Sequence, residues 1–241
     1  MARDGAVAIE VQGLFKAFGA HQALRGVDMA VREGELVTIF GPNGSGKTTL
    51  IKVLATILKP TSGSVAIGGL PLPHEAQEVR RRIGVVTHQT YLYDELTPYE
   101  NLAFYGRMYG VRGLVDRIRT VVAQVGLEAR LHDRVRTLSN GMQRRLAIAR
   151  AVLHNPSVLL LDEPEVGLDE HAVNLLEDLL AHLNDGKRTV VMTTHNLERG
   201  LRMSDRVMIL VDGRIAYHEA RVALDMARLR GAYAQYSGAR T

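Results

Sequence analysis

Residues 41–48 read Gly-Pro-Asn-Gly-Ser-Gly-Lys-Thr, which fits the phosphate-binding pattern G-x-x-x-x-G-K-[ST]. The apolar run Leu36–Phe40 precedes this segment, and residues 49–58 after it have helical character. Glycines let the loop backbone curl with its N–H groups pointing inward, and the N-terminus of the following helix adds partial positive charge. The segment therefore predicts a strand–loop–helix unit that binds the phosphates of a nucleoside triphosphate.

Two side chains of this loop have specific expected roles. The amine of Lys47 supplies a positive charge for the outer phosphates, and the hydroxyl of Thr48 is a ligand for Mg²⁺. The predicted nucleotide-binding residues of this segment are Gly41, Pro42, Asn43, Gly44, Ser45, Gly46, Lys47, Thr48 and Thr49.

Composition excludes some other kinds of site. The 241 residues include no cysteine, which excludes disulfides and cysteine-ligated metals and fits a cytosolic protein. No apolar run approaches the roughly 18 residues of a membrane span, and the N-terminal residues lack a secretory pattern. The net charge of +4 is mild. We therefore expect the basic clusters at residues 80–82 and 144–145 to be solvated helix faces, the alternative being contacts with nucleic acid or acidic headgroups.

Strand and helix signals alternate along most of the chain, which indicates an α/β fold with a parallel sheet covered by helices. Two strands, at 7–12 and 21–31, flank a turn at residues 18–20. Further strands are predicted at 64–67, 83–87, 157–162, 188–193, 206–211 and 214–217, and helices at 114–125, 142–154, 171–183 and 197–203. Helical periodicity from residue 91 to 154 indicates a helical insertion, and the last twenty residues predict a helix with a frayed end.

A second motif ends the apolar strand predicted at 157–162. Asp162 and Glu163 follow Leu161, and two carboxylates at the end of a buried strand require a nearby cation. Beside a phosphate loop that cation is Mg²⁺, held through Asp162, while Glu163 could orient and deprotonate a water molecule. The alternative, a capped strand end in a solvated loop, is disfavoured by the phosphate-binding segment elsewhere.

These motifs occur in the order and spacing of the ATP-binding-cassette (ABC) ATPases, which the chain resembles over about residues 7–218. The elements that carry the resemblance are residues 41–48, Gln89, the Leu-Ser-Asn-Gly-Met-Gln segment at 138–143, residues 160–163, Gly167-Leu168-Asp169 and His195. The resemblance implies one nucleotide-binding domain over 1–241 that binds ATP and Mg²⁺. It implies a P-loop NTPase (RecA-like) core at 1–88 and 155–220, which includes an N-terminal antiparallel β subdomain. A helical subdomain at 89–154 and a C-terminal helix and tail at 221–241 complete it.

The resemblance also assigns roles to residues whose local sequence leaves them open. Phe18 would stack on adenine, the alternative being a core residue beside a turn. Gln89 would reach Mg²⁺ and the attacking water, although a lone glutamine is ordinarily a surface residue. His195 would contact the γ-phosphate, although a lone histidine is more often structural. The implied catalytic residues are Glu163, His195 and Gln89, and the implied Mg²⁺ ligands are Thr48, Gln89 and Asp162.

The segment at 138–143 predicts a second anion site at a helix start, formed by Ser139 and the N–H groups near Gly141. The resemblance implies that this site closes over ATP held by a second cassette, most simply in a homodimer, with Asp169 in the same composite site. Three residues depart from the family pattern. Asn140 replaces a glycine but tolerates positive φ; Met142 lacks the hydrogen bonds of a glutamine; Val166 lacks a serine hydroxyl. We expect a working ATPase, with these positions as the places where turnover could be slowed.

The segment from Tyr91 to Tyr109 contains five of the eight tyrosines of the chain. It is either a groove for a helix of a membrane subunit or part of the core of the helical subdomain, and the sequence favours neither. The resemblance is strongest to export-type cassettes. Among these it is strongest to the ATP-binding subunits of haem export in cytochrome c maturation, followed by drug, lipid or polysaccharide exporters.

The resulting hypothesis is an ATPase subunit at the cytoplasmic face of the membrane, with separate transmembrane subunits docking near Gln89–Tyr109. A soluble ABC ATPase acting on nucleic acid or ribosomes is the main alternative. It is disfavoured because the chain has neither a second cassette nor a coiled-coil insertion, so no nucleic-acid partner is expected. A regulator that binds nucleotide without turnover is disfavoured by Glu163.

Overall fold

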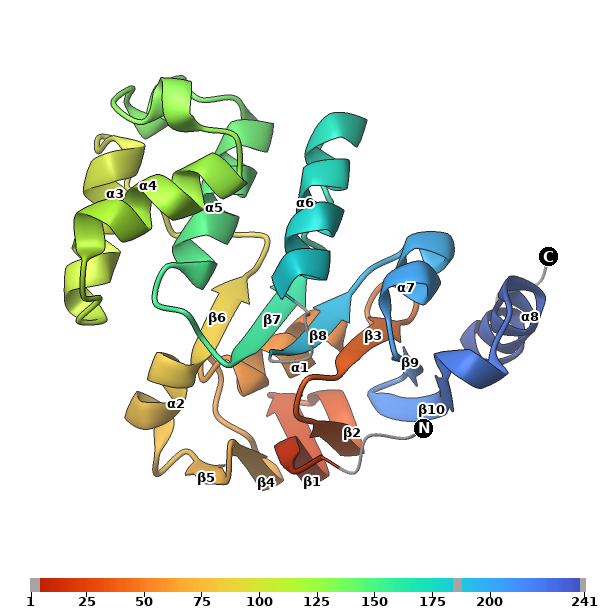
Figure 1. Cartoon of the computed structure of the whole chain (residues 1–241). Helices are drawn as coiled ribbons and strands as arrows, with labels where there is room; N and C mark the ends of the chain where they lie inside the picture. Colours follow the sequence, from red (N-terminus) through yellow and green to blue (C-terminus); the bar gives the residue numbers. More distant parts are fainter. Residues whose placement is uncertain (1–4, 184–187, 239–241) are drawn as a thin grey trace.

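The computed structural model describes residues 5–183 and 188–238, which form two β-sheets and their covering helices (Figure 1). The strands are β1 (Val7–Phe18), β2 (His21–Arg32), β3 (Leu36–Phe40), β4 (Ser62–Ile67), β5 (Leu70–Leu72), β6 (Ile83–Val86), β7 (Val158–Asp162), β8 (Thr189–Thr193), β9 (Arg206–Val211) and β10 (Arg214–Ala220). The α-helices are α1 (Lys47–Leu54), α2 (Ala76–Arg82), α3 (Pro98–Met108), α4 (Leu114–Gln124), α5 (Asn140–Val152), α6 (Glu170–Leu183), α7 (Leu197–Met203) and α8 (Met226–Ser237).

The larger sheet has six strands in the order β10-β9-β3-β8-β7-β6, parallel except for β10, which runs antiparallel to β9. Every residue of β3, β7 and β8 is buried, as expected for apolar strands covered on both faces. Because the strands are parallel, the carboxyl ends of β3, β8, β7 and β6 are neighbours along one edge of the sheet. The loops that carry most of the predicted site residues leave from this edge.

The smaller sheet is antiparallel, in the order β2-β1-β4-β5, and lies below the larger sheet in Figure 1. Side chains of both sheets and of α1 form one hydrophobic cluster, which includes Ile9, Leu24, Leu50 and Leu160. Helix α1 is therefore held by apolar contacts with both sheets, and the phosphate-binding loop that precedes it is anchored at both ends.

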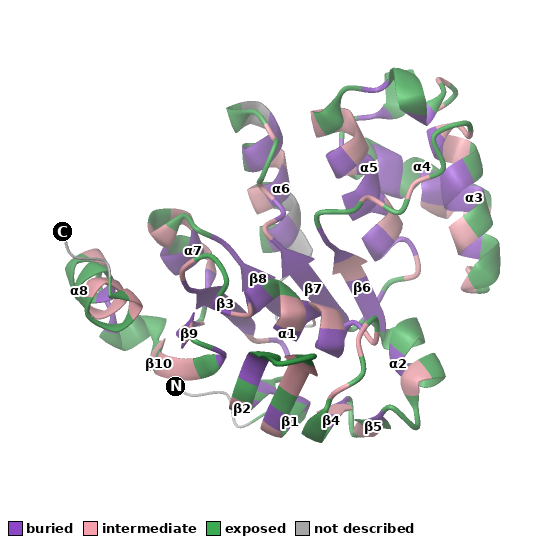
Figure 2. Ribbon diagram, turned by 180° about the vertical axis from the view of Figure 1, so that it is seen from behind, coloured by how far each residue is buried: buried purple, intermediate pink, exposed green. Residues whose placement is uncertain are grey.

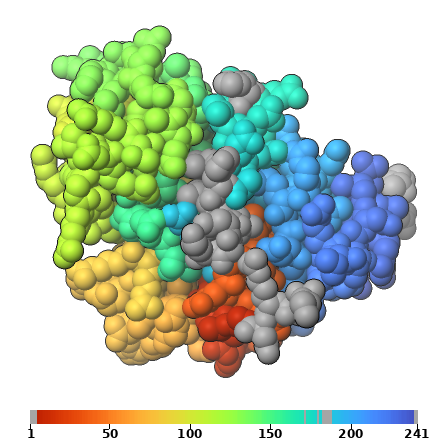
Figure 3. Space-filling model, in the orientation of Figure 1, coloured from red at the N-terminus to blue at the C-terminus, as the bar shows by residue number. Residues whose placement is uncertain are grey.

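Helices α3, α4 and α5 stand together beyond the β6 edge of the larger sheet (Figures 1 and 2), and in the space-filling view they form the green lobe at the upper left (Figure 3). Their buried faces meet in a second cluster, in which Leu102, Ile118 and Leu146 join residues of β7, β8 and α6. Helix α3 begins with a capping box, in which Thr97 and Glu100 exchange hydrogen bonds, and has Pro98 at its first position. A third cluster holds α8 on β9 and α7 through Leu229.

The observed architecture confirms the predicted fold class, with its P-loop core, antiparallel subdomain and helical insertion. The prediction missed β5 and gave no bounds for α2, although it placed residues 80–82 on an exposed helix face, as observed. Strand β5 has only three residues, and α2 buries only Val79, so neither has a clear apolar period. Within residues 5–183 and 188–238, no helix combines the length and apolar character needed to cross a bilayer.

Candidate active site

The phosphate-binding loop connects the buried end of β3 to the first residue of α1, Lys47. Gly41 and Gly46 have φ values of 155° and 106°, in the region that favours glycine. A Cβ on Gly41 would lie 2.2 Å from the carbonyl oxygen of Leu210, and a Cβ on Gly46 would lie 2.5 Å from that of Ala23. Both positions therefore require glycine for the loop to pass this close to its neighbours.

Lys47 is buried, and its Nζ donates hydrogen bonds to the carbonyl oxygens of Gly41 at 2.7 Å and Pro42 at 3.1 Å. Burial lowers the pKa of Lys47, while the negative charges of Glu163 and Asp162 raise it. The buried Ser45 Oγ has no hydrogen-bond partner among the described residues. A buried ammonium group and an unpartnered hydroxyl within a glycine loop fit a bound phosphate chain.

Asp162 is the last residue of β7 and pairs in register with Thr193 of β8. The Thr193 hydroxyl donates a 2.8 Å hydrogen bond to Asp162 Oδ1, and both side chains are buried. This bond leaves the second carboxylate oxygen of Asp162 available. Thr193, for which the sequence predicts only a place in a strand, therefore orients the proposed metal-binding carboxylate.

Glu163 leaves the line of β7 with a φ of 49°, which is uncommon for a residue other than glycine and is characteristic of functional sites. Its backbone N–H donates to both the carbonyl oxygen and the hydroxyl of Thr193, each at 3.1 Å. Its Oε1 contacts Nε2 of His195, which lies just beyond β8. The structure thus brings two of the three predicted catalytic side chains into contact.

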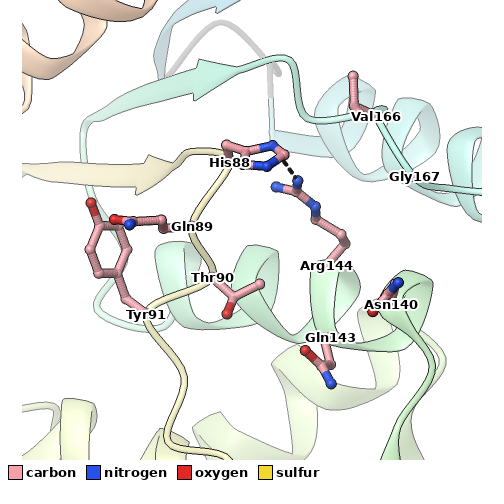
Figure 4. Close-up of a pocket in the computed structure, with 9 residues that line it drawn as sticks. All are labelled: His88, Gln89, Thr90, Tyr91, Asn140, Gln143, Arg144, Val166 and Gly167. Carbon is pink, nitrogen blue, oxygen red and sulfur yellow. Dashed lines mark hydrogen bonds between the residues drawn. The ribbon is translucent and has the colours of Figure 1, made fainter.

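The third, Gln89, lies in the loop after β6, the strand that pairs with β7. It lines a cavity of about 710 Å³ formed by this loop, the start of α5 and the loop after Glu163 (Figure 4). In Figure 4 the Gln89 side chain points away from Arg144, to the side on which Tyr91 lies. The cavity lining includes no residue of the phosphate-binding loop, so this cavity is distinct from the phosphate site.

Ser139 is the N-cap of α5, and its Oγ accepts a 3.3 Å hydrogen bond from the N–H of Met142. A Cβ on Gly141 would lie 3.8 Å from the carbonyl oxygen of Gly167 and 3.9 Å from Ser139 Oγ, with nothing from residues 41–48 within 4 Å. The start of α5 is therefore not in contact with the chain's own phosphate loop at this position.

One detail of the prediction for this segment is wrong. Asn140 is the first residue of α5 and does not have positive φ, so tolerance of the left-handed conformation does not explain how asparagine is accommodated. Met142 packs against the second hydrophobic cluster. Gln143 donates to the carbonyl oxygens of Val135 and Leu138, both at 3.2 Å, and holds the approach to α5 in place.

The remaining predicted residues lie near the surface. Asp169 Oδ1 accepts a 2.7 Å hydrogen bond from Ala172 N–H, which caps α6, and Val166 is exposed in the preceding loop. Phe18 is also exposed, 48%, with Lys16 Nζ 4.9 Å from its ring centroid. The alternative of Phe18 as a core residue is therefore wrong, and its stacking on adenine stays a prediction.

Arg144 is a structural link that the sequence analysis missed. It is buried, and its guanidinium donates a 2.7 Å hydrogen bond to the carbonyl oxygen of Thr87 and lies 3.1 Å from Nδ1 of His88 (Figure 4). Burial lowers the pKa of Arg144, and the charge of Asp162 raises it. The neighbouring Arg145 donates to the carbonyl oxygens of Val125 and Gly126. The expectation that this pair is a solvated helix face is therefore wrong.

The tyrosine-rich segment is divided between the core of the helical subdomain and the surface, and its docking of a membrane subunit stays a prediction. Leu102 is fully buried, and Tyr99 and Tyr105 pack against the second hydrophobic cluster. Four other large side chains are exposed, namely Tyr91, Tyr93, Phe104 and Met108. Tyr93 and Phe104 are in edge-to-face contact, with ring centroids 5.3 Å apart. We call these four residues the aromatic patch.

The described residues contain no group of three or more histidine, aspartate or glutamate side chains arranged to hold a metal ion. The predicted Mg²⁺ ligands are thus two neutral side chains, Thr48 and Gln89, and one carboxylate, Asp162. Such a set fits a cation that takes its other ligands from water and from phosphate oxygens.

Comparisons with known proteins agree with this site. The family model described as "ABC transporter" matches residues 24–166, more than half of the chain. The ABC transporter ATP-binding protein YdbJ of Bacillus subtilis is 39% identical over 209 residues, which are 86% of this chain and 67% of YdbJ. The linearmycin resistance ATP-binding protein LnrL of the same organism is 34% identical over 85% of this chain and 67% of LnrL. The Nod factor export ATP-binding protein I of Cupriavidus metallidurans is 34% identical over 86% of this chain and 69% of its own length.

Two solved structures show the same fold. A dimeric post-hydrolysis state of the ATP-binding cassette MJ0796, bound to ADP and Pi, superposes with a TM-score of 0.81 at 31% identity, covering 88% of this chain and 98% of MJ0796. An ATP-binding subunit of an ABC transporter superposes with a TM-score of 0.86 at 27% identity, covering 94% and 99% of the two chains. The chain therefore belongs to the ABC transporter family, as an ATP-binding subunit with the ATPase cassette fold.

Proposed function

We propose that this chain hydrolyses ATP to power export through separate transmembrane subunits, as one of two cassettes that close on each other. The observation that carries the proposal is the arrangement along the carboxyl edge of the larger sheet. There Lys47, Asp162 and the contacting pair Glu163–His195 leave from neighbouring strands. A buried cation beside two carboxylates and a histidine provides both phosphate binding and a base for water.

The proposed cofactors are ATP and Mg²⁺. The glycine cradle and the unpartnered Ser45 hydroxyl suit the phosphates, and the exposed ring of Phe18 suits adenine. Thr48, Asp162 and Gln89 would hold Mg²⁺, which when bound neutralises charge on the phosphates. Asp162 is prepared for this role because Thr193 occupies only one of its oxygens.

In the proposed reaction Glu163 accepts a proton from a water molecule as the water oxygen attacks the γ-phosphorus. The bond between the γ-phosphorus and the bridging oxygen breaks, and ADP leaves with that electron pair. Lys47 stabilises the negative charge of the phosphate oxygens. His195, held against Glu163, would contact the γ-phosphate, and Gln89 would help to orient the water.

We propose that the start of α5 acts on ATP bound to a second copy of the chain. Within its own chain, a Cβ on Gly141 would meet only two atoms, each nearly 4 Å away, which is ordinary van der Waals contact. The fold itself therefore does not require glycine at this position. Close approach by a ligand held by another chain supplies a reason for it. Asp169, through the cap of α6, would position the loop that carries Val166 at the same interface.

Replacing Ser139 with arginine tests this arrangement. We expect Ser139→Arg to abolish the ATP-dependent dimer of a Glu163→Gln chain, because the larger cation would fill the space for the partner's nucleotide. ATP binding by the monomer should stay near normal, since Ser139 hydrogen-bonds Met142 N–H and lies outside the phosphate loop. Sedimentation and nucleotide titration measure the two properties.

Ser139→Thr is the matched control, because threonine keeps the hydroxyl that caps α5 and belongs to the proposed anion site, and it adds only one methyl group. It should retain the dimer. Dimers that persist in Ser139→Arg would contradict the composite site, and loss of both dimer and ATP binding would mean that the start of α5 had unfolded.

We propose that the transmembrane subunits dock on the helical subdomain near Gln89–Tyr109, which places the chain at the cytoplasmic face of the membrane. The aromatic patch supports this because large apolar side chains exposed together mark interaction surfaces, and Tyr93 and Phe104 of the patch are in contact. The division into a core at 1–88 and 155–220, a helical subdomain at 89–154 and a tail at 221–241 belongs to the same proposal.

The proposed direction is export, and the named relatives supply the support for it. Those described above include proteins of Nod factor export and linearmycin resistance, and none of them concerns haem. Haem therefore has no support as the cargo, and we propose that the chain belongs to a drug, lipid or polysaccharide exporter. A role on nucleic acid or ribosomes has less support, because the Arg144–Arg145 pair is engaged within the chain.

Purification of the tagged chain with membrane proteins encoded by neighbouring genes tests the transporter proposal. We expect a detergent-stable complex containing two copies of the chain and showing ATPase activity. Recovery of the chain with ribosomes or DNA, and without a membrane protein, would contradict the proposal.

A further inference from the structure

A second cavity, of about 210 Å³, lies between the core and the helical subdomain. Its walls come from the end of α1, from α2 and β6, from the end of α5 and from both ends of the tyrosine-rich segment. The lining residues are Ala55, Thr56, Ile57, Arg80, Ile83, Val85, Tyr91, Tyr109, Arg150, Ala151 and His154. None of them belongs to the proposed nucleotide site, so the cavity needs a separate explanation.

The cavity carries two positive charges and no carboxylate among its lining residues. Arg150 donates a 2.9 Å hydrogen bond to the carbonyl oxygen of Val85, and its guanidinium lies 5.6 Å from the ring centroid of Tyr91 and 5.2 Å from that of Tyr105. Arg80 Nε donates a 2.8 Å hydrogen bond to the Thr56 hydroxyl. Arg80 is exposed and Arg150 is half-buried. The partners named for both guanidinium groups are neutral, so no carboxylate balances either charge within the cavity.

His154 adds no third charge. Burial lowers its pKa to about 4, and the positive charges of Arg150 and Arg117 act in the same direction. Its Nε2 lies 3.0 Å from the carbonyl oxygen of Ile83, and its ring stacks on Tyr109 with centroids 4.0 Å apart. The cavity thus has an aromatic wall with cationic groups beside it.

The exposed lining residues of the cavity are Ile57, Tyr91 and Arg80, so its mouth has an apolar part and a cationic part. Ile57 is 46% exposed and Tyr91 is 39% exposed, and Tyr91 also belongs to the aromatic patch. An occupant that suits both parts carries apolar side chains around one negative group. A protein helix with one carboxylate meets this description, whereas a lipid headgroup would leave the aromatic patch uncovered.

We propose that the docking segment of the transmembrane subunit inserts one carboxylate side chain into this cavity, between Arg80 and Arg150, with apolar neighbours on the aromatic patch. This rests on the proposed function, because it takes the partner to be a membrane subunit. It adds the chemistry of the contact and extends the docking surface to α1, α2 and the end of α5. The carboxylate would select the partner by charge as well as by shape.

The test compares two adjacent arginines of α2 in a complex of the tagged chain with the membrane protein encoded beside it. Arg80 lines the cavity, whereas Arg81 does not and forms an ion pair with Glu78 at 3.3 Å. We expect Arg80→Glu to reduce the membrane protein recovered per chain by at least about tenfold, which corresponds to the roughly 1.5–3 kcal/mol of a charged hydrogen bond. Arg81→Glu should recover close to the wild-type amount, and thermal melting shows that both variants are folded.

The second arm reverses the partner's charge. Carboxylates in the cytoplasmic loops of the membrane protein are changed to lysine one at a time, and one of them should restore binding to Arg80→Glu. Equal recovery with Arg80→Glu and Arg81→Glu, or no restoring lysine, would overturn the inference. Arg80-dependent binding to phosphatidylglycerol vesicles without the membrane protein would assign the cavity to lipid and also overturn it. If the wild-type chain recovers no membrane protein, the proposed function fails instead.

Discussion

Replacement of Glu163 by glutamine is expected to lower ATP turnover by about 10²–10⁴-fold, the usual contribution of a general base. Glutamine keeps the shape of the side chain and the positive φ of the turn after β7, and its amide can still contact His195. It cannot accept a proton from water. ATP-bound dimers should therefore accumulate, and phosphate release together with size-exclusion chromatography in MgATP measures both effects.

Glu170→Gln is the control for this change. Glu170 is exposed in the first turn of α6, and its replacement by glutamine removes the same charge a few residues from Glu163 in the sequence. The ATP turnover of the Glu170→Gln variant should stay within roughly twofold of wild type, the range expected for surface substitutions. Undiminished turnover in Glu163→Gln would reject Glu163 as the base.

Replacement of Lys47 by alanine is expected to weaken ATP binding by roughly ten- to a hundredfold, because hydrogen bonds to a charged group contribute about 1.5–3 kcal/mol. The buried Nζ already lies within hydrogen-bonding distance of two carbonyl oxygens of the loop, so the phosphates would meet a preorganised charge. Calorimetric titration with MgATP measures the loss.

Lys52→Ala removes the same charge from the last turn of α1 and should leave the affinity within about twofold. Melting curves separate weak binding from unfolding, since alanine at residue 47 also removes two hydrogen bonds within the loop. Wild-type affinity in a folded Lys47→Ala protein would contradict the phosphate cradle.

The sequence was most informative where one physical requirement dominates. Strands β3, β7 and β8 are buried along their whole length, so their apolar runs could be recognised without knowledge of their neighbours. The phosphate loop could be located because backbone curvature demands glycine, as the close approach at Gly41 shows. The role of Glu163 followed from its place at the end of a buried strand in a chain with a phosphate loop, whereas those of His195 and Gln89 came from family resemblance. All three stay predictions, although the contact between Glu163 and His195 agrees with them.

Other features depend on contacts between distant parts of the chain, and the sequence could not reveal them. Arg144 looked like a solvated residue because the carbonyl oxygen that it binds belongs to Thr87, far away in the sequence. Asn140 was judged by the conformation of a turn, but a helix begins at that residue. The positive φ of Glu163 occurs together with hydrogen bonds from its N–H to Thr193 on the adjacent strand, which is distant in the sequence. The tyrosine-rich segment could not be divided into core and surface from spacing alone.

The hydrogen bond between Arg144 and Thr87 limits how the helical subdomain can move. Its guanidinium fastens α5 to the backbone at Thr87, two residues before Gln89 and four before Tyr91. If α3, α4 and α5 rotate against the larger sheet, either the hydrogen bonds of Arg144 to Thr87 and His88 must break or the loop that follows β6 must move with the helices. If the proposed function holds, a change at the bound nucleotide and a displacement of the loop that leads to Tyr91 would be coupled through the Arg144 side chain.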